Sequence, residues 1–190
     1  MKIPDTYVLN KFYSYSMDPT FRKHDGTYNA GCPVCREGKS LGKKKRLFYY
    51  PNSSTFHCFN CSKTWSSLSW ITQVSGLTRD EINQEMPGYF VGRAEEKLGE
   101  IKNKKVLVVG VSYKPNVSDI RETPVEALIL GLKQKGAKVS WHDDLVKEWN
   151  HEKSVDLKPG FDLAIIATPH TYMDSTKLGD TPILDTRGSI

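Results

Sequence analysis

The chain has 190 residues, of which 38% are hydrophobic and 26% charged, a composition typical of a globular protein with one medium domain or two small ones. Its longest apolar runs, such as residues 106–111, are only as long as a strand. The first eleven residues contain no long apolar run and no small-residue cleavage site. The sequence therefore predicts neither a signal peptide nor a membrane span, and we expect a cytoplasmic protein.

The net charge of +5 belongs to the first half of the chain. Residues 1–90 contain 12 Lys and Arg against 7 Asp and Glu, whereas residues 91–190 contain 15 of each class. A basic segment joined to a neutral one indicates two modules, of which the first faces a polyanion.

The N-terminal segment, residues 1–28, combines polar residues with several aromatic ones. Neither a helical nor a strand period is clear in it. We therefore expect irregular structure that packs on the segment after it.

All four cysteines lie in two C-x-x-C pairs separated by 22 residues, namely Cys32, Cys35, Cys58 and Cys61. Two thiolates three positions apart on a tight turn can bind one ion, so two such pairs supply the four ligands of a tetrahedral zinc site. Four protein ligands leave no open coordination position, so this zinc would be structural and not catalytic. Two disulfides are the alternative, which the lack of any secretion signal disfavours.

The residues around the second cysteine pair have the pattern of a zinc ribbon. The aromatic run Phe48-Tyr49-Tyr50, a turn at residues 51–54 and a strand at residues 55–59 predict a hairpin that carries this pair on its outgoing strand. Apolar residues spaced by three and four then indicate a short helix, which begins at residues 66–67 and ends at Gly76.

A run of four cations precedes the hairpin and consists of Lys43, Lys44, Lys45 and Arg46, called the basic run below. These cations would neutralise phosphates, and exposed rings among Phe48, Tyr49, Tyr50 and Phe59 would stack on bases. We therefore predict binding of single-stranded DNA or RNA. The alternative is a solvated loop that balances the negative zinc-thiolate centre, with the aromatic rings filling the core of a small module.

Residues 28–77 resemble the zinc-binding domain of bacterial and phage replicative primases. The resemblance rests on Cys32-Pro33-Val34-Cys35, Phe56-His57-Cys58-Phe59-Asn60-Cys61 and Ser75-Gly76-Leu77. It implies contact with single-stranded template DNA and a catalytic domain on a separate chain, because the acidic motifs of primer synthesis have no counterpart downstream. Asn60 stands where these primases often carry Gly, so no template preference is implied.

The second half of the sequence alternates strands with helices, which predicts a parallel sheet. A connecting helix is expected to begin at Met86, with Pro87 in its first turn. The predicted strands are residues 105–110, 137–142, 163–168 and 182–185, and a helix is predicted at residues 124–135. The fold class expected is α/β, with a zinc ribbon in residues 1–80, a connecting helix in 81–103 and a Rossmann-like domain in 104–190.

Residues 82–190 resemble the C-terminal domain of the UDP-glucose/GDP-mannose dehydrogenase family, nearest to the UDP-N-acetylhexosamine type. The matching motifs are Ile82-Asn83 with Met86-Pro87, Gly110-Val111-Ser112-Tyr113-Lys114-Pro115, Asp119-Ile120-Arg121-Glu122-Thr123-Pro124, Gly136-Ala137-Lys138-Val139 with His142-Asp143, and Asp185-Thr186-Arg187. In that family this domain binds the nucleotide part of a sugar nucleotide, and a partner domain binds NAD.

The resemblance implies roles for individual residues. Tyr113 and Lys114 would line the sugar-diphosphate pocket and Arg187 would contact the nucleotide, whereas Asp119 and Arg121 would brace the loop. The alternative is that the cations among them survive as structural ion pairs. Asp143-Asp144 replaces the usual Asp-Pro of the family, which leaves the turn at that position open.

The sequence lacks a G-x-G-x-x-G turn and any cysteine outside the two pairs. We therefore expect a non-catalytic two-module protein with structural zinc, which binds single-stranded nucleic acid and a UDP-sugar or uridine nucleotide. The alternative is a fragment or subunit of an NAD-dependent UDP-sugar 6-dehydrogenase, whose partner chain supplies the NAD domain and the catalytic cysteine.

Overall fold

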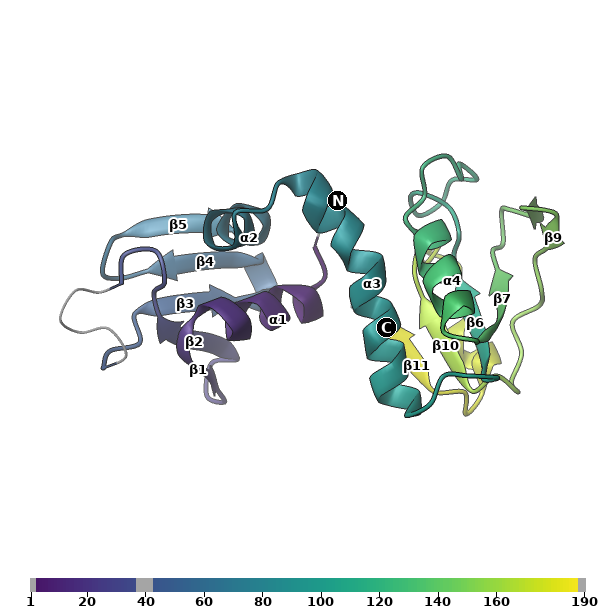
Figure 1. Cartoon of the computed structure of the whole chain (residues 1–190), viewed down its shortest axis with the longest axis horizontal. Helices are drawn as coiled ribbons and strands as arrows, with labels where there is room; N and C mark the ends of the chain where they lie inside the picture. Colours follow the sequence, from purple (N-terminus) through teal and green to yellow (C-terminus); the bar gives the residue numbers. More distant parts are fainter. Residues whose placement is uncertain (1–2, 37–42, 188–190) are drawn as a thin grey trace. The chain divides into compact units, whose positions relative to one another are not determined.

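The computed structural model describes residues 3–36 and 43–187 of the chain (Figure 1). Contacts divide the chain into two compact units, Met1–Ile82 and Asn83–Ile190. The boundary falls inside the long helix α3 (Arg79–Leu98), near its beginning. Each unit is built around a main sheet of its own.

An antiparallel sheet of five strands, which follow one another in chain order, forms the framework of the first unit. One helix precedes this sheet and another follows it (Figure 1). The predicted hairpin is confirmed, because β3 and β4 pair antiparallel across a short 3-10 turn. The elements are α1 (Asp5–Tyr15), β1 (Met17–Arg22), β2 (Thr27–Gly31), β3 (Leu47–Tyr50), η2 (Pro51–Ser53), β4 (Thr55–Cys58), β5 (Lys63–Ser66) and α2 (Ser67–Ser75).

The expectation of irregular structure in residues 1–28 is wrong, since α1, β1 and the beginning of β2 lie there. Helix α1 has an apolar face on which Tyr7, Val8 and Phe12 are buried. Tyr13 and Tyr15 of the same helix are exposed. Aromatic residues on both faces hide the helical period from a reading of the sequence alone.

Helix α2 begins and ends where the sequence predicts. The Ser66 hydroxyl accepts a hydrogen bond from the Ser69 N–H at 3.2 Å, which caps the first turn. Gly76 ends the helix in the left-handed region at φ +75°, a conformation that glycine adopts without strain.

Stacked aromatic rings fill the core of the first unit. Tyr49 of β3 and Phe56 of β4 are cross-strand partners with ring centroids 4.6 Å apart. Trp70 of α2 stacks on Phe56 at 4.2 Å, and Phe12 of α1 contacts the same ring. Both helices therefore cover the face of the sheet that carries Tyr49 and Phe56.

Helix α3 begins seven residues before the predicted start at Met86, so that predicted start is wrong. Thr78 and Glu81 form a capping box, in which the Glu81 N–H donates to Thr78 Oγ1 at 3.3 Å and the Thr78 N–H donates to the Glu81 carboxylate at 2.7 Å. Pro87 consequently lies inside the helix instead of in its first turn. The capping box determines where the helix starts because it provides acceptors for N–H groups that have no partner in the first turn of a helix.

A four-stranded parallel sheet forms the framework of the second unit, in the order β11-β10-β6-β7. The predicted parallel sheet is thereby confirmed. A small antiparallel pair, β8 and β9, was not expected from the sequence. The elements after α3 are β6 (Lys105–Val109), α4 (Val125–Gln134), β7 (Lys138–His142), β8 (Glu148–Trp149), β9 (Glu152–Lys153), β10 (Leu163–Ile166), η3 (Ser175–Leu178) and β11 (Ile183–Asp185).

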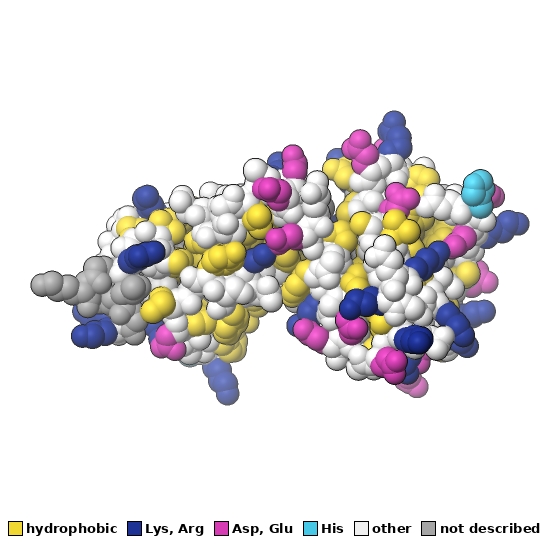
Figure 2. Space-filling view, viewed as in Figure 1, with side chains coloured by type: hydrophobic (Ala, Val, Ile, Leu, Met, Phe, Trp, Pro, Cys, Tyr) yellow, Lys and Arg dark blue, Asp and Glu magenta, His cyan; other side chains and the backbone are white. Residues whose placement is uncertain are grey.

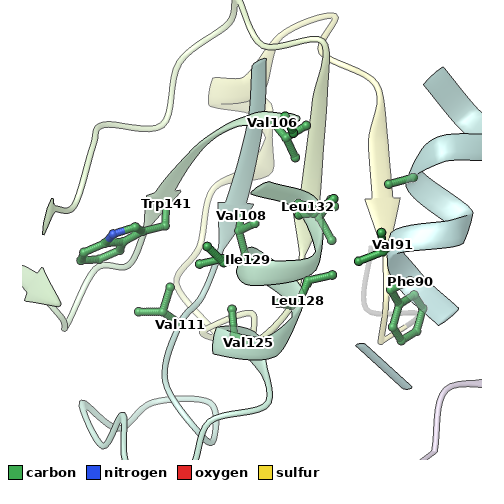
Figure 3. Packing of buried hydrophobic residues seen from close by; sticks show 14 of the residues in the cluster. Phe90, Val91, Val106, Val108, Val111, Val125, Leu128, Ile129, Leu132 and Trp141 are labelled. Atoms are coloured by element: carbon green, nitrogen blue, oxygen red, sulfur yellow. The ribbon is translucent and has the colours of Figure 1, made fainter. Parts of the chain in front are cut away.

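The core of the second unit lies between the sheet, α4 and α3 (Figure 3). Leu128 and Leu132 of α4 share this cluster with Phe90 and Val91 of α3. Strands β6 and β10 are buried on both faces, because their alternate residues pack in a second cluster with Leu178. That double burial explains why both strands have continuous apolar sequences. None of the described helices combines the length and apolar character needed to cross a bilayer.

Candidate functional site

The four cysteines converge at one point of the first unit, with all their sulfur atoms within 4.8 Å of one another. None of them forms a disulfide. The sulfur atoms of Cys35 and Cys58 are 3.8 Å apart. Two sulfur ligands of a tetrahedral zinc with bonds of about 2.3 Å are also separated by roughly 3.8 Å. The cluster can therefore hold a metal ion such as zinc.

Two tight turns position these sulfur atoms. Cys32 accepts hydrogen bonds from the backbone N–H groups of Val34 and Cys35, and Cys58 accepts them from the equivalent positions of its own turn. Burial raises the pKa of both the Cys32 and the Cys58 thiol, and these N–H groups act in the opposite direction. A cation bound to the sulfurs would hold them as thiolates.

The four cations of the basic run have different surroundings. Lys43 and Lys44 are exposed. The Nζ of Lys45 lies 2.7 Å from the Asp18 carboxylate and also donates to the Thr20 hydroxyl. The Arg46 guanidinium donates from Nη1 to Oδ1 of Asn60 at 2.6 Å.

Tyr49 cannot stack on a base in this structure, so the role expected of its ring is wrong. The residue is fully buried, and its hydroxyl donates to Asp5 Oδ1 at 2.7 Å. Burial raises the pKa of the Tyr49 hydroxyl, which keeps it a donor. Alternation along β3 places Tyr49 on the helix-covered face, which a run of three aromatic residues does not reveal.

The opposite face of the five-stranded sheet, called the open face below, carries the neighbours of the core residues. Phe48 pairs with Asn29 on one side and with His57 on the other, so these three side chains point to the same face. Phe59 contacts Phe48 edge-on at 5.4 Å and is 60% exposed. The guanidinium carbon of Arg22 lies 5.0 Å from the Phe48 ring centroid. Exposed aromatic surface and cations are therefore adjacent on this face.

The space-filling view agrees with the charge division of the sequence. Hydrophobic side chains lie beside Lys and Arg side chains on the first unit (Figure 2). Acidic and basic side chains are interspersed on the second unit (Figure 2). Only the first unit thus has the excess of positive charge that favours a polyanion.

In the second unit, the candidate site is the edge of the parallel sheet at which all four strands end, called the carboxyl edge below. Ligands of open α/β sheets bind at this edge. Gly110 follows β6 there with φ +82°, and a Cβ at this position would lie 1.9 Å from the Thr168 carbonyl oxygen after β10. The backbone segments that leave these two strands are therefore in close contact.

Asp143 follows β7 and is buried at the carboxyl edge. Its Oδ2 accepts hydrogen bonds from the backbone N–H groups of Val111 and Ser112, at 2.9 and 3.3 Å. Its Oδ1 accepts from the N–H groups of Leu145 and Val146 and from His170. Burial by itself raises the pKa of Asp143, but the hydrogen bonds from Leu145, Val111, Val146 and His170 outweigh it and the net pKa is lowered. The turn that the sequence left open is therefore held by this carboxylate.

The loop that follows β6 contains Tyr113 and Lys114. Tyr113 is partly exposed, its backbone N–H donates to the Asp119 carbonyl at 2.7 Å, and the Lys114 Nζ lies 5.3 Å from its ring centroid. Arg121 forms two hydrogen bonds to the Asp119 carboxylate, at 2.9 and 2.8 Å, and these hold the pKa of Asp119 down at about 2. This ion pair fits the bracing role that the resemblance implies, and it fits equally the alternative of a structural ion pair.

Arg187 follows β11 at the same edge. Its Nε donates to the Ala167 carbonyl at 2.8 Å and its backbone N–H donates to Asp185 Oδ1 at 2.7 Å. Burial lowers the pKa of its guanidinium. Lys114 follows β6 and Arg187 follows β11, and β10 lies between these two strands. The two strands are therefore two strand spacings apart, which is roughly 10 Å.

Two residues of the carboxyl edge were not singled out from the sequence. His170 and Thr168 are both buried in the segment after β10, and the Thr168 hydroxyl has no hydrogen-bond partner within the described part of the chain. The signal in the sequence that could have identified them is the position of polar residues directly after a buried strand, which the loop after β6 shares.

The match to a protein family lies in the second unit. Residues 107–190 match the UDP-glucose/GDP-mannose dehydrogenase family, UDP binding domain. The UDP-N-acetyl-D-mannosamine dehydrogenase of Methanococcus maripaludis is 30% identical over 104 residues, which are 53% of this chain and 24% of the relative. The corresponding protein of Methanocaldococcus jannaschii is 34% identical over 98 residues, 49% of this chain and 22% of the relative.

A solved structure of a UDP-glucose dehydrogenase from Pyrobaculum islandicum has a TM-score of 0.50 and 26% identity, and the match covers 64% of this chain and 29% of that chain. The aligned stretch of 104 residues in the Methanococcus relative is longer than residues 107–190, so it includes sequence before Leu107. The chain spans about a quarter of the length of these curated relatives. Residues 107–190 are thus similar, in sequence and in fold, to the UDP-binding domain of UDP-sugar dehydrogenases.

Proposed function

We propose that the chain is a two-module binding protein. The second unit binds a UDP-sugar or uridine nucleotide at its carboxyl edge, and the first unit, stabilised by zinc, contacts single-stranded nucleic acid. The observation that carries the nucleotide proposal is the match of residues 107–190 to a UDP-binding domain.

The chemistry of the carboxyl edge supports a diphosphate ligand. Lys114 supplies a cation from the loop after β6 and Arg187 supplies one from the segment after β11. The hydrogen bond from Arg187 Nε to Ala167 orients the guanidinium, so its terminal amino groups are the ones proposed for a phosphate. Each charge-assisted contact contributes about 1.5–3 kcal/mol. After the cost of association, we expect micromolar to millimolar affinity.

The Thr168 hydroxyl adds a second argument. Buried polar atoms almost always have a hydrogen-bond partner, and this one has none within the described part of the chain. It lies after β10, the strand between those that lead to Lys114 and Arg187. Its oxygen is closed to solvent in this structure, so a ligand that spans the two cations would supply the missing partner only if the segment after β10 moved.

Calorimetry of the whole chain with UDP and with UDP-N-acetylglucosamine tests this proposal. We expect saturable heat for the wild type and at least tenfold weaker binding for Lys114→Ala and for Arg187→Ala. Lys158→Ala is the matched control, since this exposed lysine precedes β10 and so lies toward the other end of the strands. No heat at millimolar ligand, or equal losses in all three variants, would leave the domain without a nucleotide site.

Single-stranded nucleic acid as the ligand of the first unit is favoured by the open face. Aromatic rings supply stacking surfaces that accept any base, and cations beside them neutralise the backbone. Phe59 is the exposed ring, and Lys43 and Lys44 are the exposed cations of the basic run. Fluorescence anisotropy with a labelled oligothymidine, repeated in the presence of an unlabelled duplex, tests binding and strand preference.

The length of the relatives favours a second candidate function, in which this chain is a subunit or fragment of an NAD-dependent UDP-sugar dehydrogenase. The chain covers only about a quarter of those enzymes. All four of its cysteines belong to the cluster in the first unit. Reduction of NAD with a UDP-sugar by the purified chain alone would contradict the binding-protein proposal, whereas activity only after addition of a partner chain would support this second candidate.

A further inference from the structure

We propose that Asn60 is a positioning residue that couples the four-cysteine cluster to Arg46 of the basic run, so that metal binding fixes this cation for contact with a phosphate. The inference rests on the proposed zinc centre and on the proposed nucleic-acid contact of the first unit. Neither proposal uses the Asn60 side chain or its hydrogen bond with Arg46.

The Asn60 side chain is held at both of its ends. Its Nδ2 donates to the Cys35 sulfur at 3.4 Å, and its Oδ1 accepts from Arg46 Nη1 at 2.6 Å. The amide orientation is determined by these partners, because the reverse orientation would direct the NH₂ group at a guanidinium that can only donate. Asn60 therefore links a metal ligand directly to a cation.

The backbone fixes the relative position of the two ends. The Phe59 N–H donates to the Arg46 carbonyl oxygen at 2.9 Å. Leu47, the next residue after Arg46, is the cross-strand partner of Cys58. The cysteine turn and the end of the basic run thus move together, and the link through Asn60 needs no rearrangement to form.

The negative charge of the metal centre favours the hydrogen bonds that Asn60 forms with Cys35 and Arg46. A zinc ion with four thiolates carries two net negative charges, which N–H···S hydrogen bonds help to disperse. Cys32 and Cys58 receive these bonds from backbone N–H groups, whereas Cys35 receives one from the side chain of Asn60. The negative centre would also attract Arg46, and a guanidinium suits a phosphate because it presents several N–H donors in a planar fork.

The experiment compares Asn60→Ala, Arg46→Ala and the double variant with the wild type in the full chain. Asn52→Ala is the matched control, because Asn52 is an exposed asparagine in the hairpin turn away from the cysteines. Zinc affinity is measured by chelator competition, and the sulfur environment is measured by the charge-transfer absorption of the cobalt-substituted protein. Binding of oligothymidine to the zinc-loaded proteins is measured by anisotropy.

We expect Asn60→Ala to weaken zinc binding about tenfold, the lower end of the range for outer-shell partners, and to shift the cobalt charge-transfer band. The losses in Asn60→Ala and Arg46→Ala should be less than additive in the double variant, since both variants break one link. Oligothymidine affinity should fall in both single variants and not in Asn52→Ala.

Wild-type zinc affinity and an unshifted cobalt band in Asn60→Ala would overturn the coupling while leaving the zinc centre intact. No metal in the wild type would overturn both. Altered zinc and cobalt properties with unchanged oligothymidine binding would overturn the contact of Arg46 with phosphate and retain the link to the metal. Arg46→Lys keeps the charge without the planar fork, so it provides the same cobalt readout if Arg46→Ala does not fold.

Discussion

The imidazole of His170 donates a hydrogen bond from Nε2 to Oδ1 of Asp143 at 3.0 Å, with both side chains buried. The Nδ1 of the same ring accepts from the backbone N–H of Asn116 at 2.8 Å, which assigns the proton to Nε2. His170 follows β10, Asp143 follows β7 and Asn116 lies in the loop after β6. One imidazole therefore connects the segments that leave three neighbouring strands, and the shape of the carboxyl edge depends on it.

Asp143→Asn is expected to destabilise the second unit by about 3 kcal/mol, because its NH₂ group would face backbone donors and leave them unsatisfied. Asp180→Asn is the matched control at an exposed aspartate of the same unit. Hydrogen exchange of the full chain measures the change through the protection of β6 and β10. Equal protection in the two variants would show that the hydrogen bonds of Asp143 contribute little.

Acid should remove the stability that Asp143 provides. Its folded pKa lies below the ordinary value of 3.8, so its contribution is complete above that value and disappears as the pH falls through the lowered pKa. The stability of the second unit should therefore decrease with falling pH below about pH 4. The decrease should be smaller in Asp143→Asn, as measured by urea unfolding at pH values between 2 and 6. Parallel pH profiles for the two proteins would assign the acid sensitivity to other carboxylates.

The sequence was most informative where one physical constraint acts along a continuous stretch. Residues 106–109 and 163–166 are apolar throughout because both faces of β6 and β10 are buried. The two cysteine pairs have a spacing that favours a shared centre over two disulfides, and the structure brings their sulfurs together. These patterns predicted the parallel sheet and the metal cluster.

The features that were missed depend on choices that the local pattern leaves open. Tyr49 and Phe48 are both aromatic neighbours in β3, and only the packing of α1 and α2 decides which of them is buried. Pro87 obscured the capping box of Thr78 that starts α3. The contact of His170 with Asp143 joins residues 27 positions apart, which a reading of periodicity does not detect.

Gly110→Ala should destabilise the second unit by more than about 3 kcal/mol, since the methyl group would collide with the backbone of Thr168 and the residue would keep a left-handed φ. Gly92→Ala is the control, because a Cβ there meets no atom within 4 Å and the residue lies inside α3. This control should stabilise the helix by up to about 1 kcal/mol. Thermal unfolding of both variants measures the difference, and a neutral Gly110→Ala would mean that the two segments can separate at no cost.

Metal removal should affect the two units differently. The first unit has a small core, so loss of its four-ligand centre through Cys58→Ser should unfold it, while the parallel sheet of the second unit stays protected from hydrogen exchange. Elemental analysis of the wild type should give one zinc per chain. A folded first unit in Cys58→Ser, seen as unchanged protection of β3 and β4, would show that the aromatic core suffices without metal.

Binding of single-stranded nucleic acid should depend on salt through the cations that can reach phosphates. Lys45 forms an ion pair with Asp18, so we take Lys43, Lys44 and Arg46, which is itself bonded to Asn60, as the expected phosphate contacts of the basic run. Three contacts predict a slope of log affinity against log salt of roughly −2 on single strands.

The substitution of both exposed lysines by alanine should bring that slope close to −0.7, the value expected for one remaining contact. Phe59→Ala should leave the slope unchanged and weaken binding by about 1–3 kcal/mol, because it removes a stacking surface without removing charge. Tyr15→Ala is the matched control at an exposed ring at the end of α1. An unchanged slope after loss of both lysines would mean that the basic run is a solvated loop, and equal effects of Phe59→Ala and Tyr15→Ala would exclude the open face as the binding surface.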